Sequence, residues 1–137
     1  MKQVNQFAEV LVQVLLKKKK GNEQQALQLI NEALKELNED SSKAFNDLNL
    51  EETVELFTQQ GHFNWKLALT TADLLYEECE MLREAKSEHS ALQALLLYRK
   101  ARVEPNVVFP LEAFQKIKIL EHNLVNSPGL NEIDDLL

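Results

Sequence analysis

The chain has 137 residues and a formal net charge of −7, with 45% hydrophobic and 27% charged residues. This length suits a single domain with its own core, and the hydrophobic content argues against wholesale disorder. The negative charge disfavours nucleic acid and membrane surfaces as main partners, because both present phosphate groups that would be repelled. With only three glycines and three prolines, the composition favours helix nearly throughout.

The first third of the chain predicts two helices. Apolar residues recur on one stripe from about Lys2 to Lys18, and Gly21 then ends the helix. Asn22 caps a second helix that runs to about Leu37. The stripes consist of Val4, Phe7, Ala8, Leu11, Val14 and Leu15 in the first helix, and Ala26, Leu27, Ile30, Ala33, Leu34 and Leu37 in the second. The polar residues within Val4–Leu16 indicate an amphipathic helix rather than a secretory signal.

The middle of the chain predicts two more helices. Residues 38–49 are mainly polar, and Asn49 then caps a short third helix that Gly61 halts. A fourth helix begins near Asn64, and the chain turns at about 86–88. No alternating pattern typical of a strand is apparent.

The fifth helix, from about Glu88 to Val103, has apolar residues on most sides and is therefore expected to be the most buried. Pro105 and Pro110 bracket 106–109, which we expect to be an extended connector. Pro110 suits the first turn of a sixth helix. The apolar residues of that helix are Phe114, Ile117, Leu120, Leu124 and Val125.

Residues 1–126 are thus expected to form one helical domain, and 127–137 an acidic amphipathic tail. Pro128 and Gly129 separate this tail from the sixth helix. Its aliphatic residues have helical spacing and its acidic residues lie on the other side, so it could dock in an apolar groove of this chain or of a second copy. Simple fraying of the chain end is the alternative. The aliphatic residues are Leu130, Ile133, Leu136 and Leu137.

One small signature occurs twice in the sequence. Two alanines flank a large apolar residue at offsets of four and three, so the three lie on one helix face. The two copies are Ala26, Ile30, Ala33 and Ala94, Tyr98, Ala101. Ala26 and Ala94 are 68 residues apart, which is twice the 34-residue period of tetratricopeptide arrays.

The segment Gly21–Leu34, GNEQQALQLINEAL, resembles the second half of a tetratricopeptide repeat, and ALLLYRKA near Ala94 resembles it again, with His89 in place of the glycine. The first-helix signature of that family is absent. The chain is also similar to small, uncharacterised bacterial tetratricopeptide-like proteins. The resemblance implies an all-α fold of stacked antiparallel hairpins, a right-handed superhelix of about six helices. A generic helical bundle is the alternative.

Two runs of charge have both a functional and a structural interpretation. Lys17–Lys20 could bind an anion, but four lysines at a helix end also complement the helix dipole. The acidic stretch from Asp73 to Glu88 could hold a metal, but none of its glutamates has a histidine three residues later. We therefore interpret the first as a solvated helix end and the second as a solvated helix face.

No residue set predicts catalysis. Cys79, the only cysteine, lies on an apolar stripe and is interpreted as a buried, inert thiol. Its isolation excludes an internal disulfide and suits a reducing compartment. The histidines are scattered, and the chain lacks a glycine-rich phosphate loop. We expect no enzyme activity, cofactor or metal, and a cytoplasmic location.

Phe63 and Trp65 are the candidate partner-binding residues, because aromatic side chains concentrate binding energy. They could instead be a hydrophobic staple and a core anchor. The sequence thus predicts a small interaction module, an adaptor or scaffold that binds a protein or peptide. A self-associating structural bundle, such as a homodimer, is the competing prediction.

Overall fold

The computed structural model describes residues 2–39, 42–82, 84–105 and 107–137, and these residues confirm an all-α protein. A short 3-10 helix, η1 (Phe45–Asp47), precedes α3, and a small hairpin of β1 (Thr58–Gln59) and β2 (His62–Phe63) follows it. The α-helices of the described residues are α1 (Lys2–Lys19), α2 (Glu23–Leu37), α3 (Leu50–Leu56), α4 (Trp65–Met81), α5 (Glu84–Arg102), α6 (Leu111–Asn123) and α7 (Gly129–Leu136).

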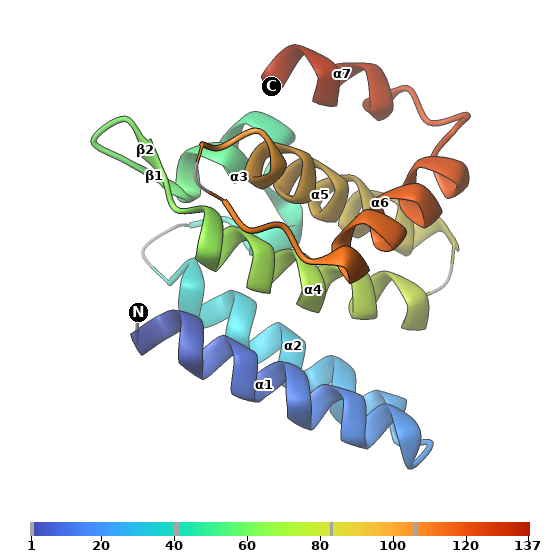
Figure 1. The fold of residues 1–137 in the computed structure, drawn as a ribbon. Helices are drawn as coiled ribbons and strands as arrows, with labels where there is room; N and C mark the ends of the chain where they lie inside the picture. Colours follow the sequence, from blue (N-terminus) through green and yellow to red (C-terminus); the bar gives the residue numbers. More distant parts are fainter. Residues whose placement is uncertain (1, 40–41, 83, 106) are drawn as a thin grey trace.

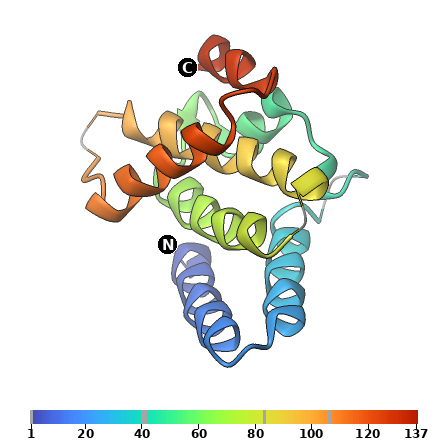
Figure 2. The same ribbon diagram turned by 90° about the vertical axis from the view of Figure 1, so that its right-hand side faces the viewer.

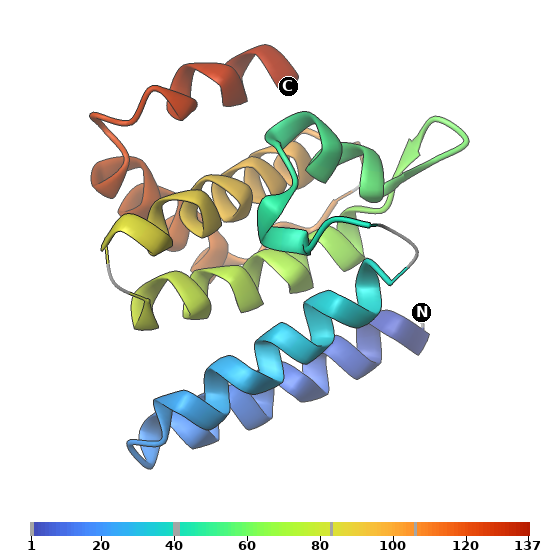
Figure 3. The ribbon, with the colours of Figure 1, turned by 180° about the vertical axis from the view of Figure 1, so that it is seen from behind.

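The antiparallel pair of α4 and α5 forms the middle of the molecule, and the contacts between these two helices are the most extensive in the fold. The α1–α2 hairpin lies against α4, with one helix on each side of it (Figure 2). On the other side of the molecule, α3, α6 and α7 pack around α5 (Figures 1 and 3). The α1–α2 hairpin and α7 therefore lie at opposite ends of the stack.

Local backbone chemistry explains the α1–α2 turn. Gly21 has φ +77°, a left-handed conformation that glycine adopts at little cost. Its N–H donates to the Lys18 carbonyl at 3.0 Å, and the Asn22 N–H donates to the Lys17 carbonyl at 2.8 Å. These two bonds form a Schellman motif that closes α1. Asn22 then caps α2 by accepting from the Gln25 N–H.

The predicted burial of the fifth helix is confirmed. Every residue from Ser90 to Tyr98 is buried, including the consecutive Leu95, Leu96 and Leu97. The predicted turn at 86–88 is wrong, because α5 already begins at Glu84. The sequence there contains neither glycine nor proline, so nothing in it interrupts the helix.

The β1–β2 hairpin was not predicted. Gln60 has φ 53° and Gly61 has φ 79°, and two successive left-handed residues make the tight turn that suits a two-residue hairpin. Thr58 pairs with Phe63, and Gln59 with His62. Gly61 therefore forms a hairpin turn after α3 has ended rather than terminating a helix. Two-residue strands are too short to show an alternating pattern in the sequence.

Most predicted stripe residues are buried, but several are not. Phe7 and Val14 are in the core, whereas Ala8 and Leu15 are exposed. Of the stripe predicted for the sixth helix, Ile117, Leu120 and, just after α6, Leu124 are in the core, whereas Phe114 and Val125 are exposed. Residues 107–110 are non-helical; Asn106 of the predicted connector lies outside the described residues.

The C-terminal tail forms α7, and its central side chain, Ile133, is fully buried among core residues. The helix contacts α3 and α5. Gly129 permits this close approach, since a Cβ on that residue would lie 2.6 Å from Leu92 Cδ1. The tail is therefore docked on its own chain in this structure.

Overpacking tests the contact of α2 with its neighbours. Ala33 is 4% exposed, so Ala33→Leu should lower the free energy of unfolding by about 1–3 kcal/mol, because the added carbons have no space. Urea unfolding of both proteins measures this loss. Ala8→Leu, on the exposed side of α1, is the control and should change little. Equal stability of the Ala33 variant and the wild type would place Ala33 in solvent.

Removal of α7 tests its docking. Deleting 129–137 exposes the apolar surface beneath Ile133, whose burial contributes about 1.5–3 kcal/mol. We expect stronger fluorescence of a hydrophobic dye and a lower melting temperature than the full chain gives. Unchanged dye binding and melting temperature would show that α7 contributes nothing to the core.

Candidate interaction surfaces

The structure does not bring the two predicted partner-binding residues together as one aromatic surface. Phe63, on β2, is only 9% exposed and packs against Phe57, with ring centroids 6.4 Å apart. Trp65, the first residue of α4, is partly buried against the core, and the Lys66 ammonium lies 5.5 Å from its ring centroid. Core packing thus covers most of the Phe63 side chain and leaves little of it for a partner. A role of Trp65 in binding stays a prediction.

The outward face of α1 is the candidate interaction surface. Val12 is 54% exposed, and Leu15 and Leu16 are each 45% exposed. Offsets of three and four place these side chains next to one another on one helix, so they form a continuous apolar surface. Single exposed apolar residues are ordinary, whereas adjacent ones on one helix are a candidate interaction surface. We call Val12, Leu15 and Leu16 the α1 face.

Sequence reasoning missed the α1 face, although a signal was present. Val10, Val12 and Leu16 lie outside the predicted stripe, so apolar residues occupy more than one side of α1. A helix that is apolar on more than one side has more apolar surface than one neighbouring layer can cover.

A second apolar surface surrounds the start of α6. Val108 and Leu111 are 84% and 74% exposed, and Phe114 is also exposed. The ring of Phe114 packs edge-on against that of Phe109, with centroids 4.8 Å apart. This surface combines a non-helical segment with the first turn of a helix.

The lysine run at the end of α1 connects two layers. Lys18 Nζ lies 2.7 Å from Glu77 Oε1 and 3.1 Å from Glu80 Oε1, both on α4. Partial burial lowers the pKa of Lys18, but the hydrogen bonds and charges of the two glutamates outweigh it and leave the pKa raised. Lys18 is therefore an inter-layer contact, whereas Lys19 and Lys20 remain exposed beside the α1 face.

The interpretation of the acidic stretch as a solvated helix face is wrong for two of its residues. Glu77 and Glu78 are 6% and 1% exposed, because α4 faces α1 and α5 at this point. Glu78 accepts hydrogen bonds from Ser90 Oγ at 2.7 Å and Asn46 Nδ2 at 3.2 Å. Burial raises the pKa of Glu78, and the two hydrogen bonds only partly oppose that shift.

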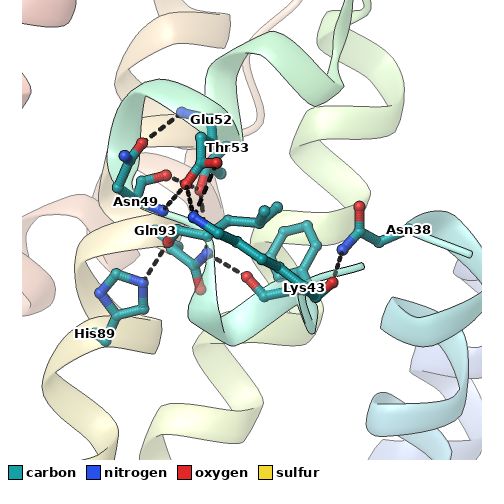
Figure 4. Close-up of polar contacts among 9 residues, drawn as sticks. Asn38, Lys43, Asn49, Glu52, Thr53, His89 and Gln93 are labelled. Carbon is teal, nitrogen blue, oxygen red and sulfur yellow. Dashed lines mark hydrogen bonds and ion pairs between the residues drawn. The ribbon is translucent and has the colours of Figure 1, made fainter. Parts of the chain in front are cut away.

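Polar side chains of α5 hold the segment that leads into α3 (Figure 4). Gln93 Nε2 donates to the Phe45 carbonyl at 2.9 Å and to Thr53 Oγ1 at 3.1 Å. His89, four residues earlier on α5, lies with Nε2 2.7 Å from the Leu48 carbonyl. Asn49 and Glu52 form a capping box at the start of α3. His89 therefore has a structural partner at the position where a repeat would carry glycine.

The Cys79 thiol and the Tyr98 hydroxyl are held in their protonated forms. Burial, together with Glu80, Glu78 and Glu77, raises the pKa of Cys79 to about 12, so its thiol is not a thiolate at neutral pH. Burial and Asp73 also raise the pKa of Tyr98, whose hydroxyl donates to Asp73. Within the described residues, no group of three or more His, Cys, Asp or Glu side chains could hold a metal ion.

Comparison with known proteins found no matching family model, no similar curated protein and no similar solved structure. None of the helices in the described part of the chain combines the length and the apolar character needed to cross a bilayer.

The buried carboxyl of Glu78 predicts a pH dependence of stability. Its folded pKa is raised, so the folded protein holds this proton at pH values where the unfolded chain, with a pKa near 4.5, has lost it. Stability from this group is therefore present at low pH and is lost as pH rises through the folded pKa. As the pH rises from about 4 to about 7, the free energy of unfolding of Glu78→Gln should therefore increase relative to that of the wild type.

Urea unfolding at both pH values measures this difference. Glu55→Gln is the control, because Glu55 is exposed on α3 and should show no such trend. A stability difference between Glu78→Gln and wild type that is the same at both pH values would contradict the burial of an ionisable carboxyl.

Proposed function

We propose that this chain is a small, non-enzymatic protein–protein interaction module of the cytoplasm, built from tetratricopeptide-like stacked hairpins. The antiparallel pairs α1–α2 and α4–α5 support the stacking. So does the burial of every residue of the repeated signature, since small residues there let neighbouring helices approach closely. These buried residues are Ala26, Ile30, Ala33, Ala94, Tyr98 and Ala101.

The observation that carries the proposal is the α1 face. Covering its three half-exposed side chains completely would contribute roughly 2–4 kcal/mol, because full burial of one such side chain contributes about 1.5–3 kcal/mol. A micromolar complex needs about 8 kcal/mol, so the partner must also contact residues around the face. Lys19 and Lys20 are exposed at its edge and favour a partner that presents acidic groups there.

Disruption of the α1 face tests the proposal. Val12→Asp/Leu16→Asp in the full chain places two charges on the face and should leave the core intact, because both residues are exposed. We expect a protein that co-purifies with the tagged wild type to bind this variant at least about tenfold more weakly, a loss of 1.4 kcal/mol or more. Binding is measured with the purified partner by calorimetry.

The matched control is Val108→Asp/Leu111→Asp, which adds the same charge to the second apolar surface. It should bind the partner as the wild type does. Equal losses in both double variants would refute a specific role of the α1 face. Sedimentation tests the competing function: a wild-type dimer that the α1 variant alone dissociates, with no other protein bound, would favour a self-associating bundle over an adaptor.

A further inference from the structure

The surface that α7 covers, between α3 and α5, is called the seat. It has the chemistry of a helix-binding site, which this chain occupies with its own C-terminal helix. On the apolar side, Ile133 is fully buried, and Leu130 and Leu136 pack against the core. On the polar side, Arg99 of α5 lies 3.0 Å from Asp134. The Lys100 ammonium lies 3.5 Å from the Leu136 carbonyl. The seat therefore recognises aliphatic side chains at a spacing of three residues, together with an acidic group beside the central one.

The seat continues past the end of α7. A cleft of about 420 Å³ lies between α3, the β1–β2 hairpin and the end of α5, and Leu136 forms part of its wall. Phe63 also lines this cleft. A longer helix placed on the seat would contact both the surface that α7 now covers and this open cleft. The cleft is also lined by Glu51, Glu55 and Glu104, so the acidic groups of such a helix belong beside Arg99 and not in the cleft.

The contacts of α7 allow it to be displaced. The helix has eight residues, and Ile133 is its one fully buried side chain within the described chain. Asp134 is 67% exposed, so its ion pair with Arg99 is screened by solvent and salt. In the connection to α6, Ser127 Oγ is buried without a hydrogen-bond partner, which disfavours the docked arrangement.

We propose that the seat beneath α7 is a second interaction site, which binds an acidic amphipathic helix of a partner protein in place of α7. The occupant seen in the structure defines the chemistry of the partner: aliphatic residues at positions equivalent to 130, 133 and 136, and a carboxylate that reaches Arg99. The site lies at the opposite end of the stack from the α1 face and does not depend on it (Figures 1 and 3).

The test uses a labelled peptide with the sequence of residues 127–137 and the full chain carrying Ile133→Asp. The substitution removes the apolar anchor of α7 and vacates the seat. Fluorescence anisotropy should show saturable binding of the peptide to this variant and binding about tenfold weaker to the wild type, where α7 competes in the same molecule. Added salt should weaken the complex, because Arg99 pairs with the carboxylate.

Three controls make the result specific. A peptide with aspartate at the position of Ile133 should not bind. Adding Arg99→Gln to the Ile133→Asp chain should weaken binding of the unaltered peptide. Adding Val12→Asp/Leu16→Asp to that same chain should leave peptide binding unchanged, which separates this site from the α1 face.

The proposal would be overturned by equal peptide affinity for wild type and Ile133→Asp, or by no binding to an Ile133→Asp chain that is folded by circular dichroism. If that variant does not fold, Asp134→Lys replaces it, because Asp134 is exposed. This chain should then bind the peptide more tightly than the wild type does, and failure to do so would reject the proposal. A stable wild-type dimer that Ile133→Asp dissociates would assign the seat to a second copy and would also reject it.

Discussion

The fold depends on α5, a helix that has no polar face along its central part. Between Ser90 and Tyr98 every side chain is buried, so water can contact no side of the helix there. A helix of this kind is stable only when other elements cover it all round. In this chain α4, α6, α3 and α7 provide that cover. The need to enclose α5 therefore explains why segments distant in the sequence converge on it.

Apolar packing alone would not fix how these segments are positioned, and the buried polar groups of α5 supply that information. Ser90 bonds Glu78 on α4, and Gln93 bonds both the Phe45 carbonyl and Thr53. Each of these donors would cost about 1–3 kcal/mol if it were buried without a partner. A shift of α4 or of η1 along α5 would break these bonds, so they select one register among several of similar apolar contact.

The sequence predicted what local chemistry decides, and it failed where neighbours decide. Caps such as Asn22 and Asn49, and the all-round apolar pattern of α5, need only nearby residues to be recognised. The burial of Glu78 depends on Ser90 and Asn46, which lie far from it in the chain. The α1 face posed the same problem, since Val12 and Val14 are equally apolar and only the placement of α2 and α4 decides which is covered. The candidate surface was therefore less predictable than the fold.

The attachment of the α1–α2 hairpin has a consequence for local unfolding. Its two helices are adjacent in the sequence, are joined by a tight turn, and make their main tertiary contacts with α4. Units of this kind open as separate foldons, at a lower free energy than global unfolding requires. A ligand held on α1 would have to be released before the helices of the hairpin could unfold, so its binding would slow amide hydrogen exchange throughout both helices. Exchange protection in α2, which lies outside the binding surface, would then report on what is bound to α1.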